Sequence, residues 1–231
     1  MNETRQAPGP SDLAEIYYAP AEVFERRRNG GFWLPLIVLV VASVVIFYAT
    51  RNLMQPVFDA EWARAAAKMR EQNPQISPEQ FEQSRGMMQS FAVVGVVMGA
   101  FLGPLLAGLI LWIVCKFAGV RESLTAAMTV MVFSFYPWLV EGIVNAIQAA
   151  FLTEESITSR YSLSLGPARF LEGASQSTLA LVGHIDLFTI WTAVLIAIGV
   201  RVTGGATRNQ AIAVAAAMWV IGALPTFLTA R

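Results

Sequence analysis

Three polar side chains interrupt the most apolar part of the chain and are the first candidates for chemistry. Glu141, Asn145 and Gln148 follow a run that reads Met-Val-Phe-Ser-Phe-Tyr-Pro-Trp-Leu-Val. Their spacing of four and three residues places them on one face of a helix. A charged group inside a bilayer costs about 2.5 to 3.5 kcal/mol on insertion scales, so this face is expected to point into a helix bundle.

His184 and Asp186 lie near the start of another apolar run. On one helix they point in nearly opposite directions, and we expect Asp186 to face inward because its face carries small residues. At 1.5 Å per residue, Glu141 and Asp186 both lie within about 10 to 15 Å of the same membrane surface. If they meet, they would share a proton or hold a cation. The alternative is that each reaches water separately or bonds to backbone for packing alone.

Composition indicates a membrane protein with several spans. Of 231 residues, 55% are hydrophobic and only 14% are charged, which is too apolar for an ordinary soluble domain. A membrane-spanning helix needs about 20 apolar residues. Five such runs occur, at residues 32–49, 91–115, 124–150, 179–200 and 210–228. We therefore predict an all-α bundle of five transmembrane helices over residues 31–231, preceded by an N-terminal segment of residues 1–30.

Several functional classes are excluded at this stage. A formal net charge of zero argues against a nucleic-acid binder. One cysteine and one histidine exclude an internal disulfide and a Cys/His metal cluster. The chain also lacks the short motifs of zinc proteases, serine hydrolases and phosphate-binding loops. We expect no catalytic residues, no metal and no cofactor.

The segment before the first span carries Arg26, Arg27 and Arg28. Cations beside a first span, and two cations in each of two short loops, favour a cytoplasmic N-terminus and an outer C-terminus. We expect a short amphipathic helix over residues 21–28, with the arginine triplet contacting anionic lipid headgroups. The alternative is that the triplet only sets orientation.

Glycines at regular spacing predict close helix packing in the second span. Gly95, Gly99 and Gly103 recur every four residues and are followed by Pro104, which is expected to kink the helix. Pro137 is a further candidate packing position, in the third span. Whether the glycine row packs inside the chain or forms a homodimer stays open, although we favour the internal contact.

The loops carry helix signals of their own. Residues 51–90 are polar, with one helix expected around residues 59–71. Another is expected to begin at Ser77 and to continue into the second span, because Ser77-Pro78-Glu79-Gln80 has the pattern of a capping box. Residues 161–171 are expected to form an interfacial helix, and the alternative is a re-entrant piece that lies on the polar cluster.

Four stretches together resemble a known family. They are Ala19-Pro20-Ala21-Glu22-Val23-Phe24, Lys116-Phe117-Ala118-Gly119, Ser134-Phe135-Tyr136-Pro137 and Asp186-Leu187-Phe188-Thr189-Ile190-Trp191. In this order within five spans they resemble the Yip (Ypt-interacting protein) domain family, over roughly residues 15 to 228. Eukaryotic members are associated with Rab-type GTPases and vesicle formation. This chain departs from them in its N-terminal region and is similar to a prokaryotic member.

Two functions follow from these observations. The first is a non-enzymatic adaptor or organiser in a bacterial cytoplasmic membrane, which contacts membrane lipids and a membrane or cytosolic protein partner. The second is a small transporter or channel component that uses the Glu/Asp/Asn cluster to bind a proton, a cation or a lipid group. Because five spans are few for a transporter, the second function would need a homo-oligomer.

Overall fold

The computed structural model describes residues 9–171 and 173–229, and within these ranges every regular element is a helix. The first eight residues of the predicted N-terminal segment lie outside them. The α-helices are α1 (Asp12–Glu15), α2 (Pro20–Arg26), α3 (Trp33–Thr50), α4 (Gln55–Gln72), α5 (Pro78–Phe117), α6 (Leu124–Ser134), α7 (Pro137–Phe151), α8 (Gln176–Gly183), α9 (Leu187–Gly204) and α10 (Arg208–Thr229). Three 3-10 turns lie between α7 and α8: η1 (Glu154–Ser156), η2 (Arg160–Leu163) and η3 (Pro167–Phe170).

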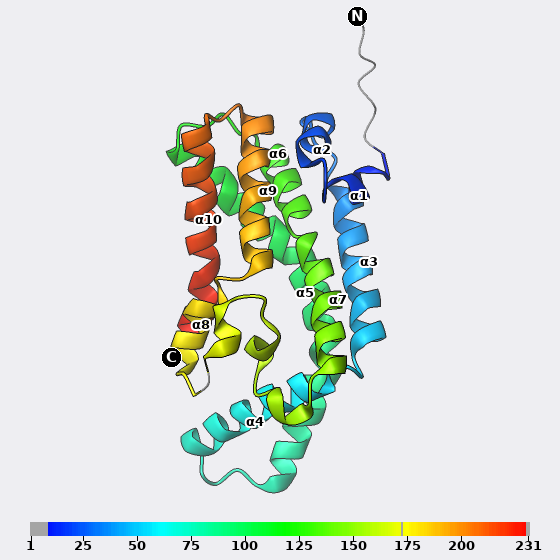
Figure 1. The fold of residues 1–231 in the computed structure, drawn as a ribbon, viewed down its shortest axis with the longest axis vertical. Helices are drawn as coiled ribbons and strands as arrows, with labels where there is room; N and C mark the ends of the chain where they lie inside the picture. The colour runs from blue at the N-terminus through cyan, green and yellow to red at the C-terminus, as the bar shows by residue number, and fades with distance from the viewer. Residues whose placement is uncertain (1–8, 172, 230–231) are drawn as a thin grey trace, which may run out of the picture.

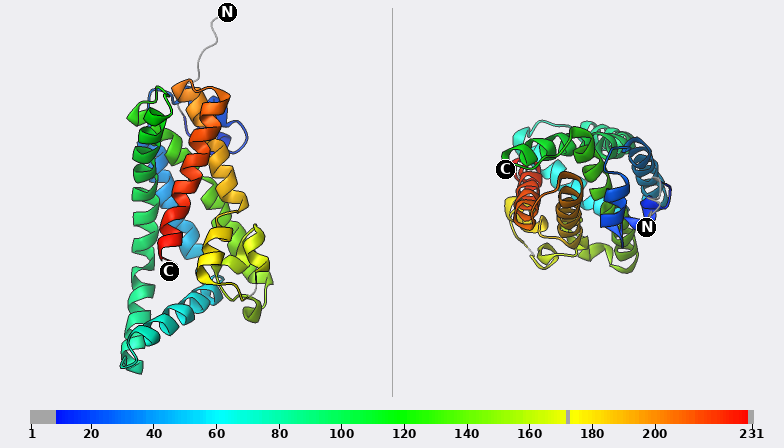
Figure 2. Two further views of the ribbon diagram at one scale, coloured as in Figure 1. Left: turned by 90° about the vertical axis from the view of Figure 1, so that its left-hand side faces the viewer. Right: turned by 90° about the horizontal axis from the view of Figure 1, so that it is seen from above.

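The long helices run side by side along the long axis of the molecule (Figure 1). We call the end that carries α1, α2 and the α5–α6 and α9–α10 turns the upper end, and the end that carries α4, α8 and the 3-10 turns the lower end. Figure 2 shows α4 and the first part of α5 projecting below the bundle. The predicted class, an all-α membrane bundle, is confirmed.

The number of spans needs a correction. Within the described residues, four helices are long and apolar enough to cross a membrane: Trp33–Thr50, Pro78–Phe117, Leu124–Phe151 and Leu187–Gly204. The fifth predicted span, residues 210–228, corresponds to α10, which runs along α9 but is not among the four.

Two of the predicted spans are interrupted. The third breaks at Phe135 and Tyr136, because Pro137 has no N–H to donate and starts α7 as its first residue. The prediction of one helix over residues 179–200 was wrong: α8 ends at Gly183 and α9 begins at Leu187. The cause is Asp186, whose carboxylate accepts the Phe188 N–H at 2.9 Å and caps α9.

The prediction for the start of α5 is confirmed. The Ser77 hydroxyl accepts the Gln80 N–H at 3.3 Å, and the Gln80 side chain accepts the Ser77 N–H at 2.9 Å. From this capping box α5 continues for 40 residues into the second span. By contrast, the interfacial helix expected over residues 161–171 is replaced by η2 and η3.

The N-terminal helices belong to the core of the bundle. Ile16, Val23 and Phe24 are fully buried in the main hydrophobic cluster, and α2 contacts α9. The Phe24 ring packs edge-on against Phe133 with centroids 6.2 Å apart. The expected amphipathic helix therefore buries its apolar side against protein and not against the membrane surface.

Candidate functional sites at the two ends of the bundle

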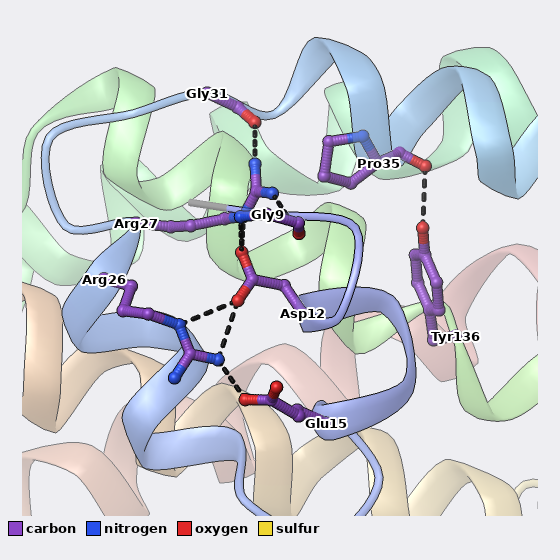
Figure 3. Close-up of polar contacts among 8 residues, drawn as sticks. All are labelled: Gly9, Asp12, Glu15, Arg26, Arg27, Gly31, Pro35 and Tyr136. Atoms are coloured by element: carbon purple, nitrogen blue, oxygen red, sulfur yellow. Dashed lines mark hydrogen bonds and ion pairs between the residues drawn. The ribbon is translucent and has the colours of Figure 1, made fainter. Parts of the chain in front are cut away.

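A buried ion-pair cluster fixes the N-terminal helices at the upper end (Figure 3). The Asp12 carboxylate is fully buried and accepts hydrogen bonds from Arg26 Nε at 2.8 Å and Arg27 Nε at 2.6 Å. Arg26 also donates to the Glu15 carboxylate. Burial alone would strongly disfavour these charges, so the two guanidinium groups and the carboxylate are stable only together.

Arg27 extends this cluster to the start of α3. Its Nη1 donates to the Gly31 carbonyl at 2.8 Å, its Nη2 donates to the Gly9 carbonyl at 3.2 Å, and its guanidinium lies 5.5 Å from the Phe133 ring centroid. The turn that presents Gly31 requires glycine, since Gly30 and Gly31 have φ of +104° and +107°. One side chain thus joins the N-terminal segment, α2 and α3.

Two tyrosines connect the cluster to the break between α6 and α7. Tyr136 donates to the Pro35 carbonyl at 2.9 Å (Figure 3), and Tyr17 donates to the Tyr136 carbonyl at 3.1 Å. The Tyr17 ring also meets Trp191 edge-on. Burial raises the pKa of Tyr17 to about 12, so its hydroxyl remains a hydrogen-bond donor at neutral pH.

The predicted lipid-contacting triplet is divided by these contacts. The guanidinium groups of Arg26 and Arg27 are held by the carboxylates of the chain itself. Arg28 is more exposed; it pairs with Glu25 at 3.2 Å and donates to the Val202 carbonyl of α9. If the triplet contacts anionic lipid, Arg28 is the member placed to do so.

Sequence reasoning missed Glu122, which lies between α5 and α6. It is only 6% exposed, and its Oε2 accepts the Thr203 hydroxyl at 2.8 Å. Its Oε1 is buried and has no hydrogen-bond partner among the described residues. Burial raises the pKa of Glu122 to about 7, against the opposing effects of Thr203 and Arg28. The upper end therefore holds a carboxyl group that titrates near neutral pH.

At the lower end, the polar row on α7 contacts the 3-10 turns. Gln148 Nε2 donates to the Leu163 carbonyl at 2.9 Å and to Asn145 Oδ1 at 3.4 Å, and Arg169 donates to Gln148 Oε1 at 3.3 Å. Glu141 is partly buried one turn before Asn145, whose side chain interacts with its carboxylate. Asparagine, glutamine and a cation thus satisfy one another beside Glu141.

Asp186 and His184 have partners elsewhere. Asp186 accepts the Ser164 hydroxyl at 2.7 Å in addition to capping α9. His184 Nε2 lies 2.7 Å from the Trp219 carbonyl of α10, and the two rings are 4.8 Å apart. No hydrogen bond joins Asp186 to Glu141 in the described part of the chain. Over the same residues, no group of three or more His, Cys, Asp and Glu side chains could hold a metal ion.

The predicted packing residues also separate into two groups. A Cβ atom added at Gly95 or Gly99 would meet no protein atom within 4 Å, so the internal contact that we favoured is not made at these two positions. A Cβ at Gly103 would lie 3.3 Å from Phe135 Cε1, and Pro104 and Pro137 are buried. The upper part of the row packs within the chain, and its lower part faces outward.

Comparison with known proteins identifies relatives of this chain. The Yip1 domain profile matches residues 14–229, which include the end of α1, all of α2 and all the long helices. Membrane protein YknW of Bacillus subtilis (strain 168) is 29% identical over 204 residues, which cover 85% of this chain and 80% of that protein. No solved structure matches the chain.

Proposed function

Because the chain belongs to the Yip1 domain family, we propose that this integral membrane protein is a non-enzymatic adaptor or organiser of a bacterial cytoplasmic membrane. The observation that carries this proposal is the upper end, where Asp12, Arg26 and Arg27 fix the N-terminal helices onto the bundle. The N-terminal helices then present a preformed surface, and a partner that binds it loses little free energy to ordering.

We place the upper end in the cytoplasm. Exposed cations lie there just after α2 and in or beside the two short turns: Arg28, Lys116, Arg121, Arg201 and Arg208. Short loops rich in lysine and arginine remain on the cytoplasmic side. In this orientation the surface that the N-terminal helices form faces cytosolic proteins.

Two aromatic side chains mark the proposed partner surface. Tyr18, between α1 and α2, is 76% exposed, and Phe117, which follows Lys116 at the end of α5, is 89% exposed. Large aromatic side chains beside positive charge are typical of binding hot spots. The partner is therefore expected to offer an apolar pocket and acidic residues.

Purification in mild detergent followed by quantitative mass spectrometry tests this function. The wild type is expected to retain a stoichiometric protein partner, and the Tyr18→Ser/Phe117→Ser variant is expected to lose it. Phe170→Ser removes an equally exposed aromatic, 78% exposed, at the lower end and is the matched control. Loss of the partner in the control as well, or a partner retained by all variants, contradicts the assignment of this surface.

Partial burial of Glu141 in a membrane span favours the second candidate, a small oligomeric transporter or channel component. Glu141→Gln with Asp186→Asn removes both charges, and asparagine keeps the cap of α9. If this variant retains the partner but abolishes proton or cation flux in reconstituted vesicles, the transporter function is supported and the adaptor function is not. The adaptor proposal requires the partner to be retained and no flux to be present in either protein.

A further inference from the structure

A cleft of about 810 Å³ lies between α3, α5 and α7 above the first turn of α4. This volume lies within the range of about 300 to 1,000 Å³ that small-molecule sites occupy. The cleft is separate from the ion-pair cluster, and of the polar residues described at the lower end only Asn145 lines it. Its occupant must therefore be inferred from its own lining.

The lining changes from apolar to polar along the bundle axis. Toward the middle of the bundle it consists of hydrophobic side chains from three helices: Ile46, Phe47, Val93 and Leu139. At the lower end polar side chains are concentrated, namely Thr50, Arg51, Asn52, Gln55 and Gln89, while Met54, Val57 and Phe58 add apolar surface beside them. Such a gradient suits a molecule with an apolar tail and a polar head.

The polar mouth carries positive charge. Arg51 is the only charged residue lining the cleft in the part of the chain that the structure describes. It is exposed at the end of α3, with its guanidinium 5.7 Å from the Tyr48 ring centroid. A guanidinium flanked by side-chain amides provides several N–H donors, which is the recognition chemistry of a phosphate group.

The dimensions match one membrane leaflet. Ser43 and Arg51 both line the cleft and are eight residues apart on α3, which is about 12 Å at 1.5 Å per residue. Half of a hydrocarbon core of about 30 Å is about 15 Å. The lining therefore extends over most of one leaflet, so that an acyl chain entering beside Arg51 could lie along it.

We propose that this cleft binds one phospholipid from the leaflet at the lower end. Its phosphate lies at Arg51, and one acyl chain lies between α3, α5 and α7. Gly142 lets α7 approach α3 closely at the inner side of the cleft, since a Cβ there would lie 3.3 Å from Ile46 Cγ2. Contact with three helices distinguishes this lipid from those that cover the outside of the bundle, and the proposal does not depend on the adaptor function.

Photolabelling of the full chain tests the acyl-chain part. The protein is reconstituted in vesicles of phosphatidylethanolamine and phosphatidylglycerol, with a phosphatidylglycerol that carries a diazirine in its acyl chain. Labelled peptides are expected to come from the lining of α3, α5 and α7 and to saturate at one lipid per chain. Ala92→Phe fills the cleft from α5 and is expected to lower this labelling about tenfold, equivalent to about 1.4 kcal/mol. Ala49→Phe adds the same ring on α3, at an exposed position outside the lining, and is expected to label like the wild type.

Arg51 tests the headgroup part. Arg51→Gln is expected to lower labelling of the cleft about tenfold through loss of a charge-assisted contact, and Arg51→Lys is expected to restore most of it. Arg121→Gln removes an exposed arginine at the upper end and should have no effect. Labelling spread evenly over all lipid-facing helices overturns the proposal. Labelling that survives Arg51→Gln overturns the phospholipid assignment. Should Ala92→Phe fail to fold, the comparison of Arg51→Gln with Arg51→Lys still tests the phospholipid assignment.

Discussion

Replacing Arg27 with glutamine is expected to loosen the docking of the N-terminal helices. The Arg27 side chain is 4% exposed and its Asp12 partner is fully buried, so the substitution leaves one of the two carboxylate oxygens without its cation. Removing one partner of a buried ion pair costs about 3 to 5 kcal/mol. The remaining bond from Arg26 to Asp12 places the expected cost near the lower value, about 3 kcal/mol. At 1.4 kcal/mol per tenfold, the undocked fraction rises about a hundredfold.

A buried reporter cysteine measures this change. Val23 is fully buried in α2, and Val23→Cys changes its volume little. The only native cysteine, Cys115, is itself buried and is replaced by alanine to remove background labelling. When opening is fast compared with labelling, the maleimide reaction rate follows the undocked fraction. The Arg27→Gln variant is therefore expected to react about a hundredfold faster.

Glu22→Gln provides the matched control. Glu22 lies on the same helix and approaches Arg26 at 3.9 Å, but its side chain is 73% exposed. An exposed pair of this kind contributes about 0 to 1 kcal/mol, so the labelling rate should change less than about fivefold. An unchanged rate in Arg27→Gln, or an equal increase in Glu22→Gln, would refute the view that the buried cluster holds these helices in place.

Two further predictions concern Glu122 and the glycines. Because burial raises the pKa of Glu122 from 4.5 to about 7, its contribution to stability is fully present below about pH 4.5 and is lost as pH rises through about 7. The Glu122→Gln variant should lose this part of the pH dependence of stability. Denaturation midpoints of both proteins at about pH 5 and about pH 8 measure it, and an unchanged pH dependence in the variant would argue against a buried, titrating Glu122. Gly199→Ala should cost about 1 to 3 kcal/mol, because its Cβ would lie 2.6 Å from Val130 Cγ1. At Gly95 an added Cβ meets no atom within 4 Å, so Gly95→Ala should be neutral or slightly stabilising. Thermal denaturation of both variants measures the difference, and equal destabilisation by both would contradict the packing described.

Local signals predicted most of the helices well. The capping box at Ser77 and Gln80 is a contact between residues three apart, so the sequence pattern alone was enough to place the start of α5. Hydropathy likewise located the apolar runs. It failed at Asp186, where a carboxylate within an apolar run was read as a mid-helix charge. Its ability to accept backbone N–H groups made it a helix cap instead.

The upper cluster could not be predicted because its contacts are tertiary. Asp12 lies 14 and 15 residues before Arg26 and Arg27, and no helical periodicity relates positions in two separate helices. The same holds for Glu122, which meets Thr203 across 81 residues of sequence. A charge preceding an apolar segment was read as a lipid contact, whereas the fold supplied a buried partner of opposite sign for two of the three arginines.

The row from Glu141 to Gln148 shows an intermediate case. Helical spacing indicated that its members share a face, but the spacing could not indicate which residues would approach that face. Arg169 and the Leu163 carbonyl come from the 3-10 turns, which have no periodic signal. A polar row in a predicted span therefore predicts how deep a polar site lies in the membrane, but not which residues of other segments contact it.

Site-specific photocrosslinking in intact cells tests the adaptor account most directly. A photoreactive amino acid replaces Phe117 at the upper end or Phe170 at the lower end, two positions of similar exposure. The account predicts one dominant protein crosslink from Phe117, lost when Tyr18→Ser is added, and no such product from Phe170. Crosslinks from Phe170 alone, or equal products from both positions, would contradict a partner surface at the upper end of the bundle.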